Sequence, residues 1–284
     1  MAELLKGAPV ADAICARTRE KAEALGSRGI LPVLAIVRVG ENDADVYYER
    51  SAMRRCEKSG VGVENVVLPA SVSQAELLAK IRALNGDARI HGVLIFRPLP
   101  KAISDEAVRA ALAPEKDVDG ITDGSLAGVF TQSGRGFCPC TAQACAEILD
   151  YYGIDCTGRR AVVLGRSLVV GKPVSQLLLA RNATVTVCHT RTRDLPRETK
   201  RADILIAAAG HAGTVGLEHV AAGQIVIDVG INTDSAGKLC GDVKFDEVEP
   251  FVTAITPVPG GVGTVTTSVL VSHVVEAAER QTRS

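Results

Sequence analysis

The sequence predicts an α/β fold made of two domains, each built on a parallel sheet. Continuous apolar runs alternate with stretches of helical period, as expected when buried strands are followed by covering helices. A section rich in Gly, Asp and Ser divides this alternation into two series. The chain has 284 residues, of which 46% are hydrophobic, so it is long enough for one large or two medium domains.

The first series begins with a helix over residues 10–25, followed by the apolar strand "LPVLAIVRVG". A helix in "DVYYERSAMRRCEKSG" and the strand "VGVENVVLP" come next. Ser73 and Glu76 form a capping box that predicts the start of a helix reaching about Leu84. The strand "HGVLIFRPLP" then ends at its prolines.

The section from Pro114 to Cys140 reads as less regular and is expected to be functional or linking. A helix over Thr141–Tyr152 opens the second series, with strands at "RAVVLG", "TVTVCH", "DILIAAAG", "QIVIDVG" and "VTAITPV". A last helix spans about Thr266–Arg280. We expect domains at 1–140, completed by 266–284, and at 141–265.

Charge and composition exclude several classes of function. The net charge is −1, so nucleic acid and acidic membranes are not expected partners. The chain shows neither a signal peptide nor an apolar span of membrane length, which predicts a cytoplasmic protein. Eight scattered cysteines predict buried free thiols, and Cys138, Cys140 and Cys145 lack the further ligands of a metal site. None of the five histidines lies in a catalytic constellation.

The segment "AVVLGRSLVVGKPVSQLLLARNATVTVCHTRT" predicts a strand, a tight turn, a helix and a second strand. Gly165 falls where the strand must turn, and Gly171 where the helix must pack closely on the sheet. Free N–H groups at the helix start would cradle a pyrophosphate. Ser167 replaces the middle glycine of the usual fingerprint, so a purely structural turn remains an alternative.

The end of the second strand indicates which dinucleotide would bind. NAD sites usually place an acidic residue there, to hold the ribose 2′-hydroxyl. Here the chain has His189, Thr190 and Arg191, with Arg166 in the turn itself. Guanidinium groups suit a 2′-phosphate, which favours NADP, although either arginine could equally be a solvated surface residue.

Five stretches occur together and in order: "RPLP", "KDVDG", "GRSLVVGKP", "VIDVGIN" and "TPVPGGVGTVT". With them the chain resembles the bifunctional methylenetetrahydrofolate dehydrogenase and cyclohydrolase family over essentially its full length. The resemblance implies a folate-binding N-terminal domain, to which the last helix returns, and a Rossmann-type NADP domain. It also implies a cleft between the domains and a homodimer.

The resemblance implies roles for individual residues. Tyr48 would stack on the pterin, and Asp119 would hold the pterin's amino group and ring nitrogen; these two are the candidate catalytic residues. The candidate substrate-binding residues are Tyr48, Phe96, Pro98, Leu99, Asp119, Pro259, Gly260 and Gly261. The candidate cofactor-binding residues are Thr141, Gly165, Arg166, Ser167, Val170, His189, Thr190, Arg191 and Ile231.

The chain departs from the family pattern around the expected folate pocket. The family's catalytic lysine, four residues after the tyrosine, falls on Ala52. The glutamine before "LPLP" falls on Phe96 and the following leucine on Arg97. Two prolines of the pattern have become Ala142 and Thr264.

These departures should affect the family's two reactions differently. Hydride transfer from methylenetetrahydrofolate to NADP moves no proton, so it needs alignment rather than an acid or base. Hydrolysis of the methenyl product needs proton transfer, which Ala52 and Phe96 cannot provide. The sequence therefore predicts an NADP-dependent dehydrogenase whose cyclohydrolase activity is lost or very weak. The alternatives are a fully bifunctional enzyme, a paralogue acting on another pterin or folate, and a non-catalytic relative that binds NADP or folate.

Overall fold

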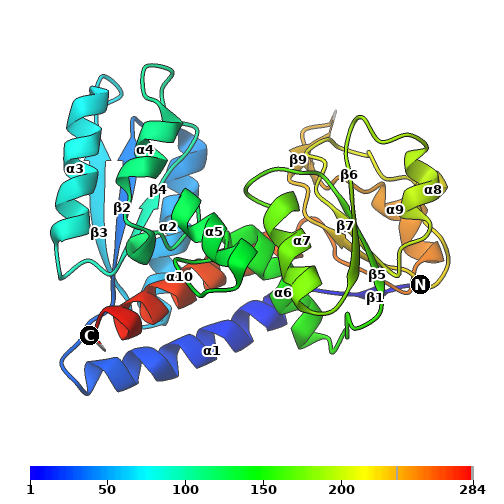
Figure 1. Cartoon of the computed structure of the whole chain (residues 1–284), viewed down its shortest axis with the longest axis horizontal. Coiled ribbons are helices and arrows are strands. Elements are labelled where there is room, and N and C mark those ends of the chain that lie inside the picture. Colours follow the sequence, from blue (N-terminus) through cyan, green and yellow to red (C-terminus); the bar gives the residue numbers. More distant parts are fainter. Residues whose placement is uncertain (235, 283–284) are drawn as a thin grey trace. The chain divides into compact units, whose positions relative to one another are not determined.

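The computed structural model describes residues 1–234 and 236–282, and the chain divides into two compact units (Figure 1). Unit 1 comprises Met1–Ala11 and Thr141–Thr266, and unit 2 comprises Asp12–Cys140 and Thr267–Ser284. Both contain parallel sheets with helices, which confirms the predicted α/β class. Residues 1–11 were expected in the N-terminal domain, with the rest of residues 1–140. They belong instead to unit 1, with residues 141–266, because β1 (Glu3–Leu4) pairs with β11 (Ala254–Ile255).

Unit 2 is built on a parallel three-stranded sheet. Its strand order is β3 (Gly62–Leu68), β2 (Val33–Val39), β4 (Gly92–Ile95). The continuous apolar run predicted a strand covered on both faces, and β2 is buried along five consecutive residues. One face packs against α3 (Gln74–Gly86) and α4 (Asp105–Ala111), with Val37, Ile95, Leu77 and Val108 in the same core. The predicted capping box at Ser73 and Glu76 is present.

Long helices complete unit 2. They are α1 (Gly7–Gly26), α2 (Asp43–Lys58) and α10 (Val262–Gln281), of which α1 and α10 each begin in unit 1. The last helix thus starts four residues before the predicted Thr266. Within unit 2, α1 and α10 lie side by side (Figure 1), and the Cys15 thiol donates a hydrogen bond to the Ser268 hydroxyl at 3.7 Å.

The section from Pro114 to Cys140 is more regular than the sequence indicated. It contains the short helix η1 (Pro114–Lys116) and the helix α5 (Asp123–Thr131). The Thr122 side chain caps α5 by accepting a hydrogen bond from the Ser125 N–H at 3.1 Å. Gly128 is required because a Cβ there would lie 1.9 Å from the Arg135 carbonyl oxygen. Tertiary contact, rather than helix propensity, therefore forms this helix.

Unit 1 contains a parallel six-stranded sheet. Its strand order is β1, β11, β8 (Ile225–Asp228), β7 (Ile204–Ala207), β5 (Arg160–Leu164), β6 (Thr184–Cys188). A small antiparallel pair, β9 (Asn232–Thr233) with β10 (Leu239–Cys240), was not predicted. The remaining elements are α6 (Cys140–Tyr151), α7 (Gly171–Ala180), α8 (Leu195–Thr199), η2 (Leu217–His219), α9 (Phe245–Val248) and η3 (Glu249–Phe251).

The strand order of unit 1 positions a candidate ligand site. The chain runs from β5 outward to β6 and then returns to β7 on the other side of β5. Open parallel sheets bind ligands at the carboxyl ends of the strands where the order reverses in this way. None of the helices within the described ranges has the length and apolar character needed to cross a membrane.

Candidate functional site

The turn after β5 has a backbone that only glycine can adopt without strain. Gly165 has a φ of +125°, and a Cβ on it would lie 2.1 Å from the Ala208 carbonyl oxygen. Gly171 begins α7, and a Cβ there would lie 2.2 Å from the Gly165 carbonyl oxygen. Both glycines thus allow the close approach of turn, helix and β7 that the sequence predicted.

Ser167 organises the start of α7. Its hydroxyl accepts hydrogen bonds from the N–H groups of Val170, at 3.1 Å, and Gly171, at 3.5 Å. Arg166 and Ser167 are exposed, so the turn presents a cationic side chain and a hydroxyl beside a helix N-terminus. The Arg166 guanidinium and the Ser167 hydroxyl can bind a phosphate group, whereas the N–H groups of Val170, Gly171 and Lys172 are already bonded to Ser167.

The turn after β6 carries further cationic and hydroxyl groups. The His189 N–H donates to the Thr192 hydroxyl at 2.9 Å, and the Arg191 N–H donates to His189 Nδ1 at 3.1 Å. Because Nδ1 accepts a hydrogen bond, the neutral His189 ring carries its proton on Nε2. Thr190, Arg191 and Arg193 are exposed. Arg193 was not among the predicted site residues.

Ile231, after β8, has an apolar side chain that is exposed to solvent. It is 70% exposed and directly follows a tightly bonded turn. The buried Asp228 carboxylate accepts hydrogen bonds from the N–H groups of Gly230, Asp242 and Val243 at 2.9–3.0 Å. Burial raises the pKa of Asp228 to about 6, and these three hydrogen bonds oppose the rise. This network fixes the turn that precedes Ile231, whose exposed side chain is available for an apolar contact.

Other predicted residues of unit 1 lie on separate elements. Thr141 is in the first turn of α6, where its carbonyl oxygen accepts from the Cys145 thiol at 3.3 Å. Pro259, Gly260 and Gly261 follow β11, and Pro259 is preceded by a cis peptide bond. Gly260 accepts a hydrogen bond from the Gly7 N–H at 2.7 Å.

In unit 2, Tyr48 on α2 meets the end of β4. Its ring contacts the Phe96 ring edge to face, with centroids 5.7 Å apart. Burial, and then the nearby Cys140 and Asp119, raise the pKa of Tyr48 far above its usual value, while a hydrogen bond with Thr267 opposes the rise. The phenol is therefore neutral at physiological pH, and Phe96 contacts its ring.

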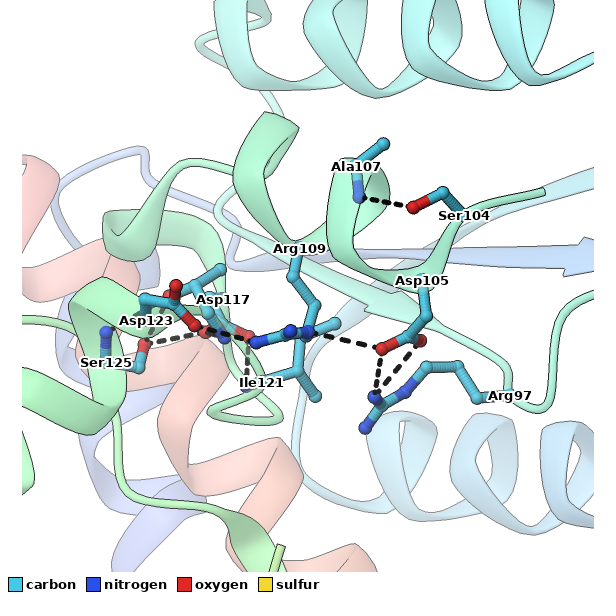
Figure 2. Close-up of polar contacts among 10 residues, drawn as sticks. Arg97, Ser104, Asp105, Ala107, Arg109, Asp117, Ile121, Asp123 and Ser125 are labelled. Carbon is cyan, nitrogen blue, oxygen red and sulfur yellow. Dashed lines mark hydrogen bonds and ion pairs between the residues drawn. The ribbon is translucent and has the colours of Figure 1, made fainter. Parts of the chain in front are cut away.

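Asp119 lies in a turn that the neighbouring Asp117 fixes. Asp117 is fully buried and accepts from the Ile121 N–H at 3.0 Å, the Thr122 N–H at 2.7 Å and the Ser125 hydroxyl at 2.6 Å, as Figure 2 shows in part. Its side chain thus satisfies three donors of the turn that follows Asp119.

Asp119 itself is half-buried and electrostatically perturbed. Burial and then the Asp117 charge raise the pKa of Asp119 to about 6, while Arg97 and a hydrogen bond with Cys140 act in the opposite direction. Burial also raises the pKa of the Cys140 thiol well above its usual range. At neutral pH the site therefore holds an ionised carboxylate beside a protonated thiol. The contributions of Cys140 and Thr267 were not predicted, because both residues come from distant parts of the chain.

The three residues after Phe96 have different environments. Pro98 is exposed and preceded by a cis peptide bond, whereas Leu99 packs against the core formed by α3, α4 and the sheet. Arg97 forms an ion pair with Asp105 at 3.3 Å. The Leu99 side chain is therefore placed to support the loop.

Ala52 follows Tyr48 by one helical turn and has no exposed surface. Beside it on α2, Glu49 receives a hydrogen bond from Arg38 Nε at 2.7 Å, and both side chains are nearly buried. Arg38 also donates to the Gly40 carbonyl oxygen. This ion pair was not predicted from the sequence. Arg38 thus links Glu49 on α2 to the backbone of Gly40, which follows β2.

Comparisons with known proteins cover the whole chain. The catalytic domain model of tetrahydrofolate dehydrogenase/cyclohydrolase matches residues 5–119, and the NAD(P)-binding domain model matches residues 139–282. The bifunctional protein FolD of Carboxydothermus hydrogenoformans is 51% identical over 281 residues, covering 98% of each chain.

Solved structures agree with these matches. The bifunctional FolD of Campylobacter jejuni is 38% identical and superposes with a TM-score of 0.96, covering 99% of each chain. A Trypanosoma brucei methylenetetrahydrofolate dehydrogenase-cyclohydrolase, solved with NADP cofactor and inhibitor, is 34% identical with a TM-score of 0.93 and covers 100% of this chain and 99% of its own. With both domain models matched and identities of this size over full length, the chain belongs to the tetrahydrofolate dehydrogenase/cyclohydrolase (FolD) family.

Proposed function

We propose that this protein oxidises 5,10-methylenetetrahydrofolate to 5,10-methenyltetrahydrofolate by direct hydride transfer, with NADP as the oxidant. The observation that carries the proposal is the group formed by Tyr48, Asp119 and Phe96, in a chain that also has a glycine-dependent turn with arginines around it. Membership of the FolD family supports the same reaction.

The group in unit 2 suits a reduced pterin. A pterin has a flat ring that can stack on Tyr48, and its 2-amino group and N3–H are adjacent donors. A carboxylate can accept both hydrogen bonds at once. Because the pKa of Asp119 is about 6, the carboxylate is ionised at neutral pH and ready to accept them. Phe96 keeps the Tyr48 ring in place through its edge-to-face contact.

The residues of unit 1 suit NADP. Gly165 and Ser167 would hold the pyrophosphate, while Arg166, Thr190 and Arg191 would bind the 2′-phosphate. Ile231 offers an apolar surface for the nicotinamide ring. When bound, NADP supplies the hydride acceptor, C4 of the nicotinamide. The relative from Trypanosoma brucei, solved with NADP, supports this choice of cofactor.

Hydride transfer needs little chemistry from side chains. The C–H bond of the bridging methylene breaks, both electrons leave with the hydrogen, and the adjacent nitrogen lone pairs stabilise the resulting cation. The protein contributes by holding the pterin at a fixed position and angle. Orientation of this kind can lower a barrier by about 7–11 kcal/mol. Tyr48 and Asp119 would do this without exchanging a proton.

The family's second reaction, hydrolysis of the methenyl product, is supported by the names of the relatives. Several, at up to 51% identity, are named bifunctional, which favours the bifunctional alternative over complete loss of the activity. Ala52 and Phe96 nevertheless carry no exchangeable proton. We therefore propose that hydrolysis persists but is slow, by roughly 10²–10⁴-fold relative to a member with the lysine.

Two assays on the purified protein test these proposals. The first follows NADP reduction with methylenetetrahydrofolate, and the second follows decay of the methenyl absorbance. We expect clear turnover in the first and decay modestly above the buffer rate in the second. Binding of both ligands in calorimetry without any NADP reduction would instead favour a non-catalytic relative, and faster turnover of another pterin would favour a paralogue. The homodimer stays a prediction, which sedimentation velocity can test.

A further inference from the structure

Arg97 carries unused hydrogen-bond donors at the carboxyl end of β4. Its Nη1 contacts both carboxylate oxygens of Asp105, at 3.3 and 3.5 Å. No other hydrogen bond of the Arg97 side chain occurs within the described part of the chain, and that side chain is 24% exposed. A guanidinium has five N–H donors, so most of them remain available to a ligand.

A row of alternating charges fixes the position of Arg97 (Figure 2). Asp105 is shared between Arg97 and Arg109, whose Nε lies 3.2 Å from it, and Arg109 Nη1 contacts Asp123 at 2.7 Å. Exposed ion pairs contribute little to the free energy of folding, so stability does not account for this row. It does restrict the conformations open to the Arg97 side chain.

Arg97 is also next in sequence to a residue of the proposed pterin position. It directly follows Phe96, whose ring contacts Tyr48. Its positive charge acts on Asp119, where it counteracts the rise in pKa caused by burial. Arg97 and the carboxylate that would hold the pterin therefore share one electrostatic environment.

The chemistry of the pterin edge indicates what Arg97 would contact. Next to the 2-amino and N3–H donors, a pterin carries the 4-oxo oxygen, which is an acceptor. Asp119 can take the donors but cannot serve this oxygen. Ala52 and Phe96 offer no donor either. A carbonyl left without a partner in a partly buried site would cost binding free energy.

We propose that Arg97 donates a hydrogen bond to the 4-oxo oxygen of the pterin and makes the site selective for 4-oxo over 4-amino pterins. This inference rests on the proposed function, since it assumes a pterin held by Asp119. A 4-amino group is a donor, and it would face the cationic Arg97 without an acceptor. A 4-amino pterin also lacks the N3–H that Asp119 would accept, so the contribution of Arg97 is the effect of its removal on each substrate.

The test compares Arg97→Leu with the unchanged protein on two substrates. These are methylenetetrahydrofolate and the corresponding methylene derivative of tetrahydroaminopterin, which has an amino group at position 4. For the 4-oxo substrate we expect kcat/KM to fall by about 10- to 100-fold, mainly through KM. For the 4-amino substrate we expect no fall, and the KM for NADP should not change.

Controls separate this role from loss of structure. Arg89→Leu removes a similar arginine, paired with Asp87 at 2.6 Å, just before β4 rather than after it, and should affect neither substrate. Thermal unfolding of each variant shows whether it is folded. Arg97→Lys, which keeps the charge but not the planar fork, should recover part of the 4-oxo preference.

The outcomes are distinct. An equal loss of kcat/KM on both substrates would overturn the inference. It would also be overturned if Arg97→Leu had no effect on a pteroate derivative that lacks the glutamate, because Arg97 would then bind the glutamate tail. If the unchanged protein turned over neither substrate, the proposed function would fail. Calorimetric affinities for the same two pterins would still decide whether Arg97 distinguishes them.

Discussion

The rings of Tyr48 and Phe96 meet edge to face, with their centroids 5.7 Å apart. Phe96, which the sequence predicts to replace the family's glutamine, contacts the tyrosine with a side chain that moves no proton. Ala52, one helical turn after Tyr48, is fully buried and equally inert. Neither of these two side chains can exchange a proton, whereas an aromatic pair can help to hold a flat ring.

The first prediction concerns position 52, where the resemblance implies that Ala52 replaces a lysine. The double substitution Ala52→Lys with Phe96→Gln should raise methenyl hydrolysis by roughly 10²–10⁴-fold, because a positioned amine can transfer protons. Burial also lowers the pKa of a lysine, so that more of the amine is neutral and able to accept a proton at neutral pH. The measurement is the rate of methenyl decay, with NADP reduction followed in parallel.

A matched variant, Ala52→Met with Phe96→Gln, controls for filling the site. Methionine is unbranched like lysine but cannot exchange a proton, so its hydrolysis rate should stay at the starting level. An equal gain in both double variants would mean that pocket shape, and not proton transfer, limits the reaction.

The second prediction concerns pH. The folded-state pKa of Asp119 is about 6, above its ordinary value of 3.8, so the carboxylate is protonated as pH falls through 6. A protonated carboxyl cannot accept both pterin hydrogen bonds. The KM for methylenetetrahydrofolate should therefore rise, by roughly tenfold per pH unit below about 6. Steady-state kinetics between pH 5 and 8 measure this, with Asp119→Asn as the control that should weaken binding and remove the dependence.

The raised pKa of Asp119 also affects stability, in the opposite direction: folate binding should improve as pH rises, whereas the free energy of unfolding should fall. Between about pH 4 and 6 the folded state binds more protons at Asp119 than the unfolded state does, so this group makes the free energy of unfolding fall as pH rises. Asp228, with a pKa of about 6, contributes in the same direction. Urea titrations across this range should show a shallower slope for Asp119→Asn; an unchanged slope would contradict the assigned pKa.

Much of the fold could be predicted because its signals are local. The apolar run of β2 and the capping box of α3 lie within a few residues of sequence, and both are present. The helix α5 was missed because Gly124, Ser125 and Gly128 disfavour helix formation, and its cap and its contact with Arg135 become visible only in the folded chain.

The candidate site divides in the same way. Tyr48 and Phe96 were both expected near the pterin, and they are in contact. Neither the Arg97–Asp105 pair nor the Arg38–Glu49 pair was foreseen, since a charge pattern along the chain does not reveal partners from different elements. Thr267 lies more than two hundred residues after Tyr48, so its hydrogen bond required the three-dimensional structure.

The third prediction concerns Asp117, which lies two residues before Asp119. Asp117→Ala leaves two buried N–H groups and one hydroxyl without their acceptor (Figure 2). Each such group costs about 1–3 kcal/mol, so we expect a loss of at least about 3 kcal/mol in the free energy of unfolding. The KM for the folate should rise as well, because the turn that carries Asp119 loosens.

Urea unfolding and steady-state kinetics measure both effects. The control is Asp123→Asn, which changes a nearby carboxylate whose side chain is 89% exposed, and we expect a change within about 0.5 kcal/mol. Similar destabilisation by the two variants would mean that loss of a negative charge in this region, rather than loss of the acceptor for the three donors, lowers the free energy of unfolding.

The last prediction concerns the choice between NADP and NAD. Arg166 and Arg191 are exposed on the turns after β5 and β6, where a ribose 2′-phosphate would lie. Hydrogen bonds to a charged group contribute about 1.5–3 kcal/mol, so Arg166→Gln or Arg191→Gln should raise the KM for NADP by about 10- to 100-fold. The KM for NAD should stay the same, because NAD has no 2′-phosphate. Arg160→Gln, at the opposite end of β5, serves as the control and should change neither value. A parallel rise for NADP and NAD would place these arginines on the pyrophosphate that both dinucleotides share, and the 2′-phosphate assignment would then be wrong.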